Sequence, residues 1–136
     1  RSNFIGVLGL SGFNPSNRRI ELSRAIFSSK MHSSRASTES FHLILKYCFE
    51  ELGYHRIGWK CNVKNEKSRS SALRYGFTYE GIIRSEFIMY DHSYDPCSYS
   101  LLSHEWPTVK QEFERWLGLE NFDESGRQKT KFLVKY

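Results

Sequence analysis

Hydroxyl and cationic side chains crowd one short stretch of the sequence, residues 30–40, just before an amphipathic segment. The stretch contains Ser33, Ser34, Ser37, Thr38 and Ser40, together with Lys30 and Arg35. A helix N-terminus offers unpaired backbone N–H groups and the positive end of the helix dipole, and both attract anions. The stretch therefore predicts a phosphate or diphosphate site. A simpler alternative is that Ser37 or Thr38 is only an N-cap and the rest is a polar loop.

The segment after this stretch has the period of a helix. Its apolar residues are Phe41, Ile44, Leu45, Cys48, Phe49 and Leu52. This spacing predicts a helix with one buried face, and Gly53 is expected to end it.

Strands are predicted on both sides of this helix. Residues 4–10 and 20–27 are strand-like runs separated by turn residues at 12–17, which predicts an antiparallel hairpin. Residues 56–63 alternate polar and apolar side chains, which is the period of a half-buried strand. Asn65 is expected to cap a second helix, over residues 66–75, that ends at Gly76.

The last third of the chain predicts two more strands and a helix. A long strand is expected over residues 82–90, with its antiparallel partner over residues 97–102. Trp106 and Pro107 open a helix that Gly118 closes. We therefore predict an α/β domain over residues 1–118, and a C-terminal tail over residues 119–136 that is mobile or forms a weak edge strand.

The predicted fold class follows from the order of these elements. Strands that alternate with helices favour a mixed, mostly antiparallel twisted sheet flanked by helices, with at least one right-handed crossover. A chain of 136 residues is expected to form one domain.

Composition narrows the classes of partner. The net charge of +5 favours anionic partners, but the cations are scattered, which disfavours nucleic acid. Neither a long apolar run nor a leader sequence is evident, so we expect no membrane segment and a cytoplasmic or nuclear location. Three cysteines without CxxC spacing suit reduced thiols, with Cys48 and Cys61 in the core. Five histidines form no HxxxH pair, so no metal site is expected.

Several short motifs carry a family resemblance. They are Thr38-Glu39, residues 49–57 (FEELGYHRI), residues 59–62 (WKCN), residues 65–69 (NEKSR), residues 75–81 (YGFTYEG) and Arg84. Through them, residues 20–117 resemble the GNAT superfamily of acetyl-CoA-dependent N-acetyltransferases, most closely the branch that resembles ribosomal-protein N-terminal acetyltransferases. The chain starts where the third strand of that fold would be. The resemblance thus implies that the first strands, and two helices that usually line the acceptor groove, are absent.

The resemblance also implies where acetyl-CoA would lie. Two splayed strands would form a V, and the pantetheine arm would pair with the backbone of Ile26, Phe27 and Ser28. The pyrophosphate would sit on the loop, which the resemblance assigns to Lys30, Ser33, Ser34, Arg35, Ala36, Ser37 and Thr38. Asn65 and Ser68 would face the cofactor from the other arm of the V.

The loop departs from the family pattern at two positions. Ser33 and Arg35 stand where glycines are usual, and glycines let the backbone approach phosphate closely. Ala72 also stands where many members carry a tyrosine acid, which leaves Ser68 as the nearer candidate acid.

Acetyl transfer to an amine needs a base, an acid for the departing thiolate and a donor for the developing oxyanion. Glu86 is the candidate base, acting through water, and its alternative role is that of a surface ion-pair partner. Ser68 is the candidate acid, and its alternative role is that of a second cap beside Asn65. A backbone N–H near Phe27 could polarise the acetyl oxygen.

Two functions therefore remain open. The first is an N-acetyltransferase that moves an acetyl group from acetyl-CoA to an amine of a protein N-terminus or a small molecule. The second is a non-catalytic or truncated GNAT-like module that binds CoA or a protein partner. A homo-oligomer is compatible with either function, and a basic nucleic-acid binder is the least favoured class.

Overall fold

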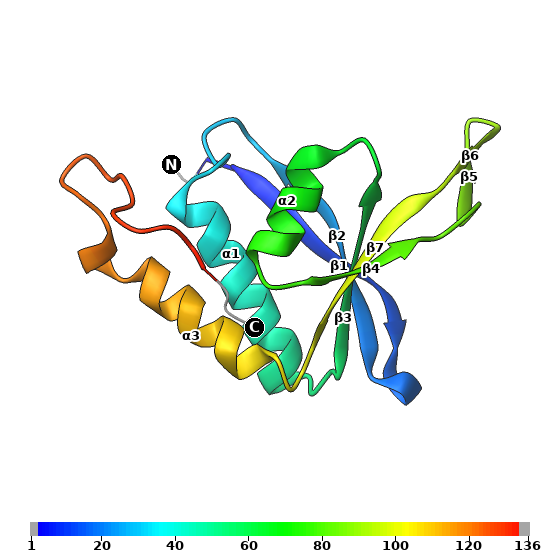
Figure 1. Ribbon diagram of the computed structural model, residues 1–136, viewed down its shortest axis with the longest axis horizontal. Helices are drawn as coiled ribbons and strands as arrows, with labels where there is room; N and C mark the ends of the chain where they lie inside the picture. The colour runs from blue at the N-terminus through cyan, green and yellow to red at the C-terminus, as the bar shows by residue number, and fades with distance from the viewer. Residues whose placement is uncertain (1–2, 134–136) are drawn as a thin grey trace.

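The computed structural model describes residues 3–133, and Figure 1 shows its helices and strands. The strands are β1 (Gly6–Asn14), β2 (Arg19–Phe27), β3 (Arg56–Asn62), β4 (Thr78–Ile82), β5 (Phe87–Met89), β6 (His92–Tyr94) and β7 (Pro96–Leu102). The helices are α1 (Arg35–Lys46), α2 (Glu66–Arg74) and α3 (Trp106–Leu117). A π-helical turn (Tyr47–Glu51) extends α1, and 3₁₀ turns follow β1 (Pro15–Asn17) and α3 (Leu119–Asn121).

Five strands form one mixed sheet in the order β1-β2-β3-β7-β4. Only β2 and β3 are parallel, and α1 lies in the connection between them; the other neighbours in this sheet are antiparallel. The predicted fold class is confirmed, as are the hairpin of β1 with β2 and a crossover through the first helix.

One face of the sheet is apolar and packs against the helices. Ile20 and Ile57 from the two central strands share a core with Phe41 of α1 and Phe113 of α3. The helices α1 and α3 lie side by side along this face (Figure 1). Trp59 stacks on Phe41, with 5.3 Å between the ring centroids. Because side chains alternate along a strand, Trp59 faces the helices while its neighbours on β3 face the opposite, polar side.

The two parallel strands separate part-way along their length. Their pairing ends at Leu22 and Trp59, although β2 continues to Phe27 and β3 to Asn62. Arg24 has a left-handed φ of 48° beside a register shift against β1, which is the geometry of a β-bulge. A bulge bends a strand and increases its twist, so it turns the end of β2 away from β3. The splayed V that the family resemblance implies is therefore present.

Two local predictions are wrong. Residues 82–90 do not form one strand: β4 ends at Ile82, and β5 pairs only with β6 in a separate hairpin that projects from the body (Figure 1). Positive φ angles at Gly81 and Ser85 bend the chain between the two pieces. The segment after Gly118 is also not a tail or an edge strand within residues 119–133, because Asn121 and Phe132 are buried against the domain. The rest of the predicted tail lies outside the described residues.

Candidate cofactor site

A cleft of about 200 Å³ lies at the point where β2 and β3 separate. Residues 22–25 of β2, residues 59–62 of β3, Asn65 just before α2 and Ser68 of α2 line it. Leu8 and Phe41 supply its apolar part. A cleft in which polar groups converge beside apolar side chains is suited to binding a small molecule. The structure therefore brings the two predicted α2 residues to the fork of the V.

Ser68 is the most constrained polar residue in this cleft. Its Oγ accepts a hydrogen bond from the indole Nε1 of Trp59 at 2.9 Å. Burial raises the pKa of the Cys61 thiol, and interaction with the Ser68 hydroxyl opposes that rise. Because the indole of Trp59 occupies an acceptor position of the hydroxyl, the Ser68 proton remains available for an acceptor in the cleft.

The capping of α2 excludes one of the two roles considered for Ser68, while its role as the acid stays a prediction. Asn65 is the N-cap, and its Oδ1 accepts from the backbone N–H of Ser68 at 3.1 Å. Ser68 is thus the capped residue and not a second cap. The predicted cap at Asn65 and the left-handed end at Gly76 are both confirmed.

The helix that follows the hydroxyl-rich loop begins earlier than its apolar stripe. Its N-cap is Ser34, whose Oγ accepts from the N–H of Ser37 at 3.2 Å and donates to the carbonyl of Met31 at 2.7 Å. The expectation of a cap at Ser37 or Thr38 is therefore wrong. The N–H groups of Arg35 and Ala36 open the helix, where no intrahelical acceptor exists. Ser33, just before the cap, has a left-handed φ of 54°.

Most hydroxyls of the loop do not face solvent. The Thr38 side chain is 1% exposed, and its Oγ1 accepts from Arg74 at 3.1 Å. The Ser37 hydroxyl is buried and donates to the carbonyl of Ser34. The prediction that these side chains contact a phosphate is therefore not supported, because internal acceptors and donors already use them. What the loop presents is backbone N–H together with the exposed side chains of Lys30 and Ser33.

Arg35 also points away from the predicted ligand. Its guanidinium donates to the carbonyl of Leu117 at 2.9 Å and lies 5.4 Å from the ring centroid of Phe122. Leu117 is the last residue of α3, where carbonyl groups lack helical partners and the dipole is negative. This end of α3 therefore competes with a phosphate for Arg35.

The free edge of β2 leads from the cleft to the loop. Ser28 donates its N–H to Ile5, and Ile26 pairs with Val7, so both direct their peptide groups towards β1. Alternate residues of a strand point their peptide groups to opposite neighbours, so Phe27 directs its N–H into the gap beside β3. Residues 23–27 span roughly 16 Å at the usual rise of a strand. The edge can therefore carry an extended arm from the loop to the cleft.

Comparison with known proteins shows what this arrangement is. A family model described as an acetyltransferase (GNAT) domain matches residues 1–78. The chain is 32% identical over 105 residues to the putative ribosomal N-acetyltransferase YdaF of Bacillus subtilis, covering 77% of this chain and 57% of that protein. The chain belongs to the GNAT acetyltransferase family.

Solved structures agree with this assignment. A GCN5-related N-acetyltransferase from Brucella melitensis is 36% identical, with a TM-score of 0.90 over 94% of this chain and 58% of that one. A probable GNAT-family acetyltransferase from Chromobacterium violaceum is 34% identical, with a TM-score of 0.69 over 74% of this chain and 50% of that one. The chain thus spans somewhat more than half the length of the curated GNAT relative that it matches.

Glu86 of this GNAT domain lies in the turn between β4 and β5, and not on a strand. It pairs with Lys60 at 2.7 Å, and Lys60 also contacts Glu21 at 3.2 Å. Burial alone would lower the pKa of Lys60, but its bonds to Glu86 and Glu21 outweigh burial and raise it. Lys60 lines the cleft, so its ion pair joins Glu86 to the site from the polar face of the sheet. The ion-pair role considered for Glu86 is present, while its role as a base stays a prediction.

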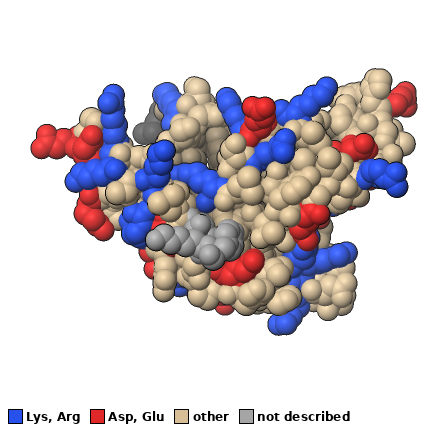
Figure 2. All heavy atoms as spheres, viewed as in Figure 1, with Lys and Arg blue, Asp and Glu red and all other residues tan. Residues whose placement is uncertain are grey.

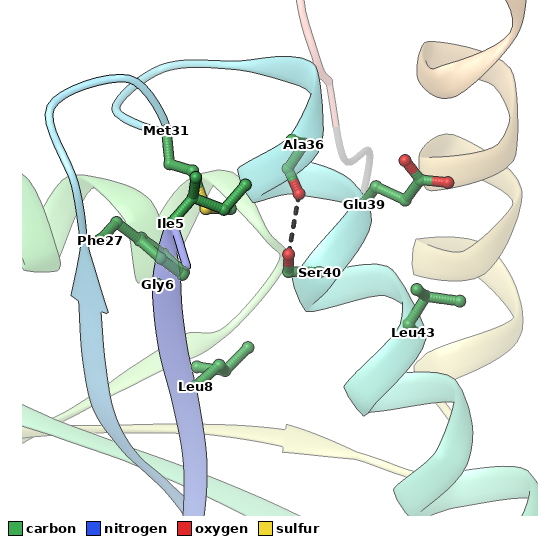
Figure 3. Close-up of a pocket in the computed structure, with 9 residues that line it drawn as sticks. All are labelled: Ile5, Gly6, Leu8, Phe27, Met31, Ala36, Glu39, Ser40 and Leu43. Atoms are coloured by element: carbon green, nitrogen blue, oxygen red, sulfur yellow. Dashed lines mark hydrogen bonds between the residues drawn. The ribbon is translucent and has the colours of Figure 1, made fainter. Parts of the chain in front are cut away.

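A second hollow of the GNAT domain, about 300 Å³, lies between β1 and α1 (Figure 3). Ile5, Leu8 and Leu43 give it a mainly apolar lining, and the hydroxyl of Ser40 is already bonded to the carbonyl of Ala36 (Figure 3). It lacks the convergent polar groups of the smaller cleft. We therefore place the reacting end of a ligand in the smaller cleft.

Charge on the visible face, membrane-spanning helices and metal-ligating groups are the other features that bear on possible ligands. Figure 2 shows Lys and Arg side chains spread over the visible face and interspersed with Asp and Glu. Among residues 3–133, no helix is long and apolar enough to span a membrane. In the same range, no group of three or more His, Cys, Asp and Glu side chains could hold a metal ion.

Sequence reasoning missed Trp59, Lys60 and Arg74 as residues that shape the site. Trp59 had a usable signal, because an indole N–H on the buried face of a strand needs an acceptor from a packed neighbour. Arg74 had none, since its partners besides the adjacent Tyr75 are the distant residues Thr38, Trp116 and Phe132.

Proposed function

We propose that this domain transfers an acetyl group from acetyl-CoA to a primary amine. The observation that carries the proposal is the Ser68 hydroxyl, held by Trp59 in the cleft at the fork of the two strands. Family membership supports acetyl-CoA as the donor. The activity itself is a proposal, because this chain spans only part of the length of its named relatives.

The reaction uses groups on both faces of the sheet. The amine nitrogen attacks the acetyl carbon, and the carbon–sulfur bond breaks. Ser68 gives its proton to the departing thiolate and takes a proton back from solvent water. Glu86 accepts the proton of the incoming amine through water. The N–H of Phe27, or one near it, stabilises the charge that develops on the acetyl oxygen.

The cofactor lies along β2 in this proposal. The pantetheine arm follows the free edge of residues 26–28, and Asn65 borders its end. The diphosphate sits on the loop, held by Lys30 and Ser33 and by the N–H groups of Arg35 and Ala36, at the positive end of α1. Arg35 would add its side chain only by leaving the carbonyl of Leu117.

The acceptor is proposed to be the N-terminal amine of a protein. The name of the Bacillus subtilis relative, a putative ribosomal N-acetyltransferase, supports this class over small amines. Cys48, Cys61 and Cys97 are all unbridged, which supports a reducing cytoplasmic location.

Release of free thiol from acetyl-CoA tests the proposal. The protein is incubated with acetyl-CoA and a panel of peptides with free N-termini, beside the same peptides with blocked N-termini and a set of small amines. Thiol release that requires a free N-terminus and yields a peptide one acetyl group heavier supports the activity and the acceptor. Binding of acetyl-CoA without thiol release on any amine would favour a non-catalytic CoA-binding module instead.

A further inference from the structure

Arg74, the last residue of α2, joins three separate parts of the chain. Its guanidinium donates to Thr38 Oγ1 at 3.1 Å, in the first turns of α1, and to the Tyr75 hydroxyl at 3.2 Å. The same group lies over the rings of Trp116 and Phe132, 4.9 and 5.1 Å from their centroids. It therefore ties the start of α1 to α3 and to the C-terminal segment.

Arg74 lies between two helix ends of opposite polarity: the C-terminal end of α2, whose dipole favours a cation, and the first turn of α1, which it contacts at Thr38. A cation is normally unfavourable near a helix N-terminus, where the dipole is positive. The first turn of α1 holds no acidic residue, and Arg74 has no ion pair with a carboxylate anywhere in residues 3–133. Aromatic rings compensate the charge in part. The start of α1 therefore combines the positive end of its own dipole with a fixed cation, and both attract an anion.

We infer that Arg74 is a positioning residue for the cofactor loop. It fixes the Thr38 side chain, and through it the first turn of α1, whose Arg35 and Ala36 N–H groups would meet the diphosphate. The inference rests on the proposed function, since it assigns the diphosphate of acetyl-CoA to this loop. It differs from a direct contact, because Arg74 acts on the ligand through Thr38.

The test is the dissociation constant for coenzyme A, measured by titration calorimetry on the full chain. Arg74→Met keeps the apolar packing but removes both hydrogen bonds and the charge, and it should weaken binding about tenfold. Thr38→Val removes the acceptor of Arg74, together with a 3.4 Å bond to the Tyr75 hydroxyl, and should weaken binding several-fold. The double variant should bind coenzyme A no more weakly than Arg74→Met does, because both substitutions break the same hydrogen bond between Arg74 and Thr38.

Two further variants separate positioning from other roles. Arg74→Lys keeps the charge, but an ammonium group cannot donate to Thr38 and Tyr75 while it stacks on the aromatic rings as a planar guanidinium does. Its affinity for coenzyme A should therefore stay close to that of Arg74→Met. Arg115→Ala is the matched control: Arg115 bonds Thr130 and the carbonyl of Lys131, and so holds the C-terminal segment without touching α1. It should leave the dissociation constant within twofold of the wild type.

Each outcome is decisive. Wild-type protein that does not bind coenzyme A defeats the proposed function itself. Wild-type binding with unchanged affinity in Thr38→Val and Arg74→Met overturns the inference alone, even if both variants unfold at lower temperature. If Arg74→Lys binds coenzyme A as tightly as the wild type, Arg74 acts through its charge at long range and not by positioning Thr38, and the inference is overturned. If Arg74→Met does not fold, Thr38→Val and Arg74→Lys still decide.

Discussion

Replacing Ser68 by alanine should lower both stability and turnover, for reasons that can be separated. The substitution removes the acceptor of the Trp59 indole N–H, and Trp59 is only 6% exposed. A buried donor left without a partner costs about 1–3 kcal/mol. For a chain of 136 residues the entropy of unfolding is roughly 290 cal/mol/K, so the midpoint of thermal unfolding should fall by about 3–10 °C. Loss of the proton donor should also reduce kcat by about a hundredfold.

Calorimetry and thiol release measure the two effects on the same samples. Trp59→Phe combined with Ser68→Ala removes donor and acceptor together, so it should recover part of the lost stability but none of the lost turnover. Ser70→Ala is the matched control, because Ser70 lies on the same helix and is exposed. The affinity for coenzyme A should change little in Ser68→Ala. Full turnover in Ser68→Ala would refute its role as the acid, and an unchanged midpoint would refute the indole bond.

Three further predictions use other residues. Burial raises the pKa of the Cys48 thiol from 9.0 to about 11, so the folded state favours the neutral thiol. This contribution to the free energy of unfolding is complete below the pKa of the unfolded thiol and is lost as pH rises towards 11. Urea titrations from pH 8 to 11 should therefore show the wild type losing up to about 2.7 kcal/mol more of its free energy of unfolding than Cys48→Ala does. An equal dependence of stability on pH in the two proteins would contradict this prediction. Ser33→Gly should raise the unfolding midpoint slightly, because it relieves a left-handed φ, whereas Ser29→Gly should lower it; the reverse order would exclude strain at Ser33. Glu86→Gln should lower kcat/KM at least tenfold, because it removes the proposed base. Glu80→Gln is the control, since it disturbs an ion pair with Arg56 and should not lower kcat/KM to this extent. Equal effects of the two substitutions would exclude Glu86 as the base.

The sequence predicted the order of elements well because strong local signals agreed with one another. Asn65 and Gly76 bracket α2 as their types suggest, and Gly53, with a φ of 68°, follows the first helix. Side-chain chemistry and backbone preference point the same way at these positions. Such positions can be assigned without knowledge of the rest of the fold.

The details of the site could not be predicted because they depend on contacts between distant residues. Apolar periodicity placed the first helix near Phe41, but the polar turn that precedes the stripe is helical too, and Ser34 caps it. The burial of Thr38 follows from Arg74, which lies far along the chain. The end of β4 at Ile82 likewise depends on a positive φ at Gly81 that alternation of side chains does not signal.

Hydrogen exchange with and without coenzyme A tests most directly whether the free edge of β2 and the loop after it bind the cofactor. The account predicts slower exchange at the amides of residues 23–37 and 60–68, with little change around Ile5 and Leu43 in the apolar hollow. Protection confined to the amides around Ile5 and Leu43, or no protection in either place at saturating coenzyme A, would contradict it.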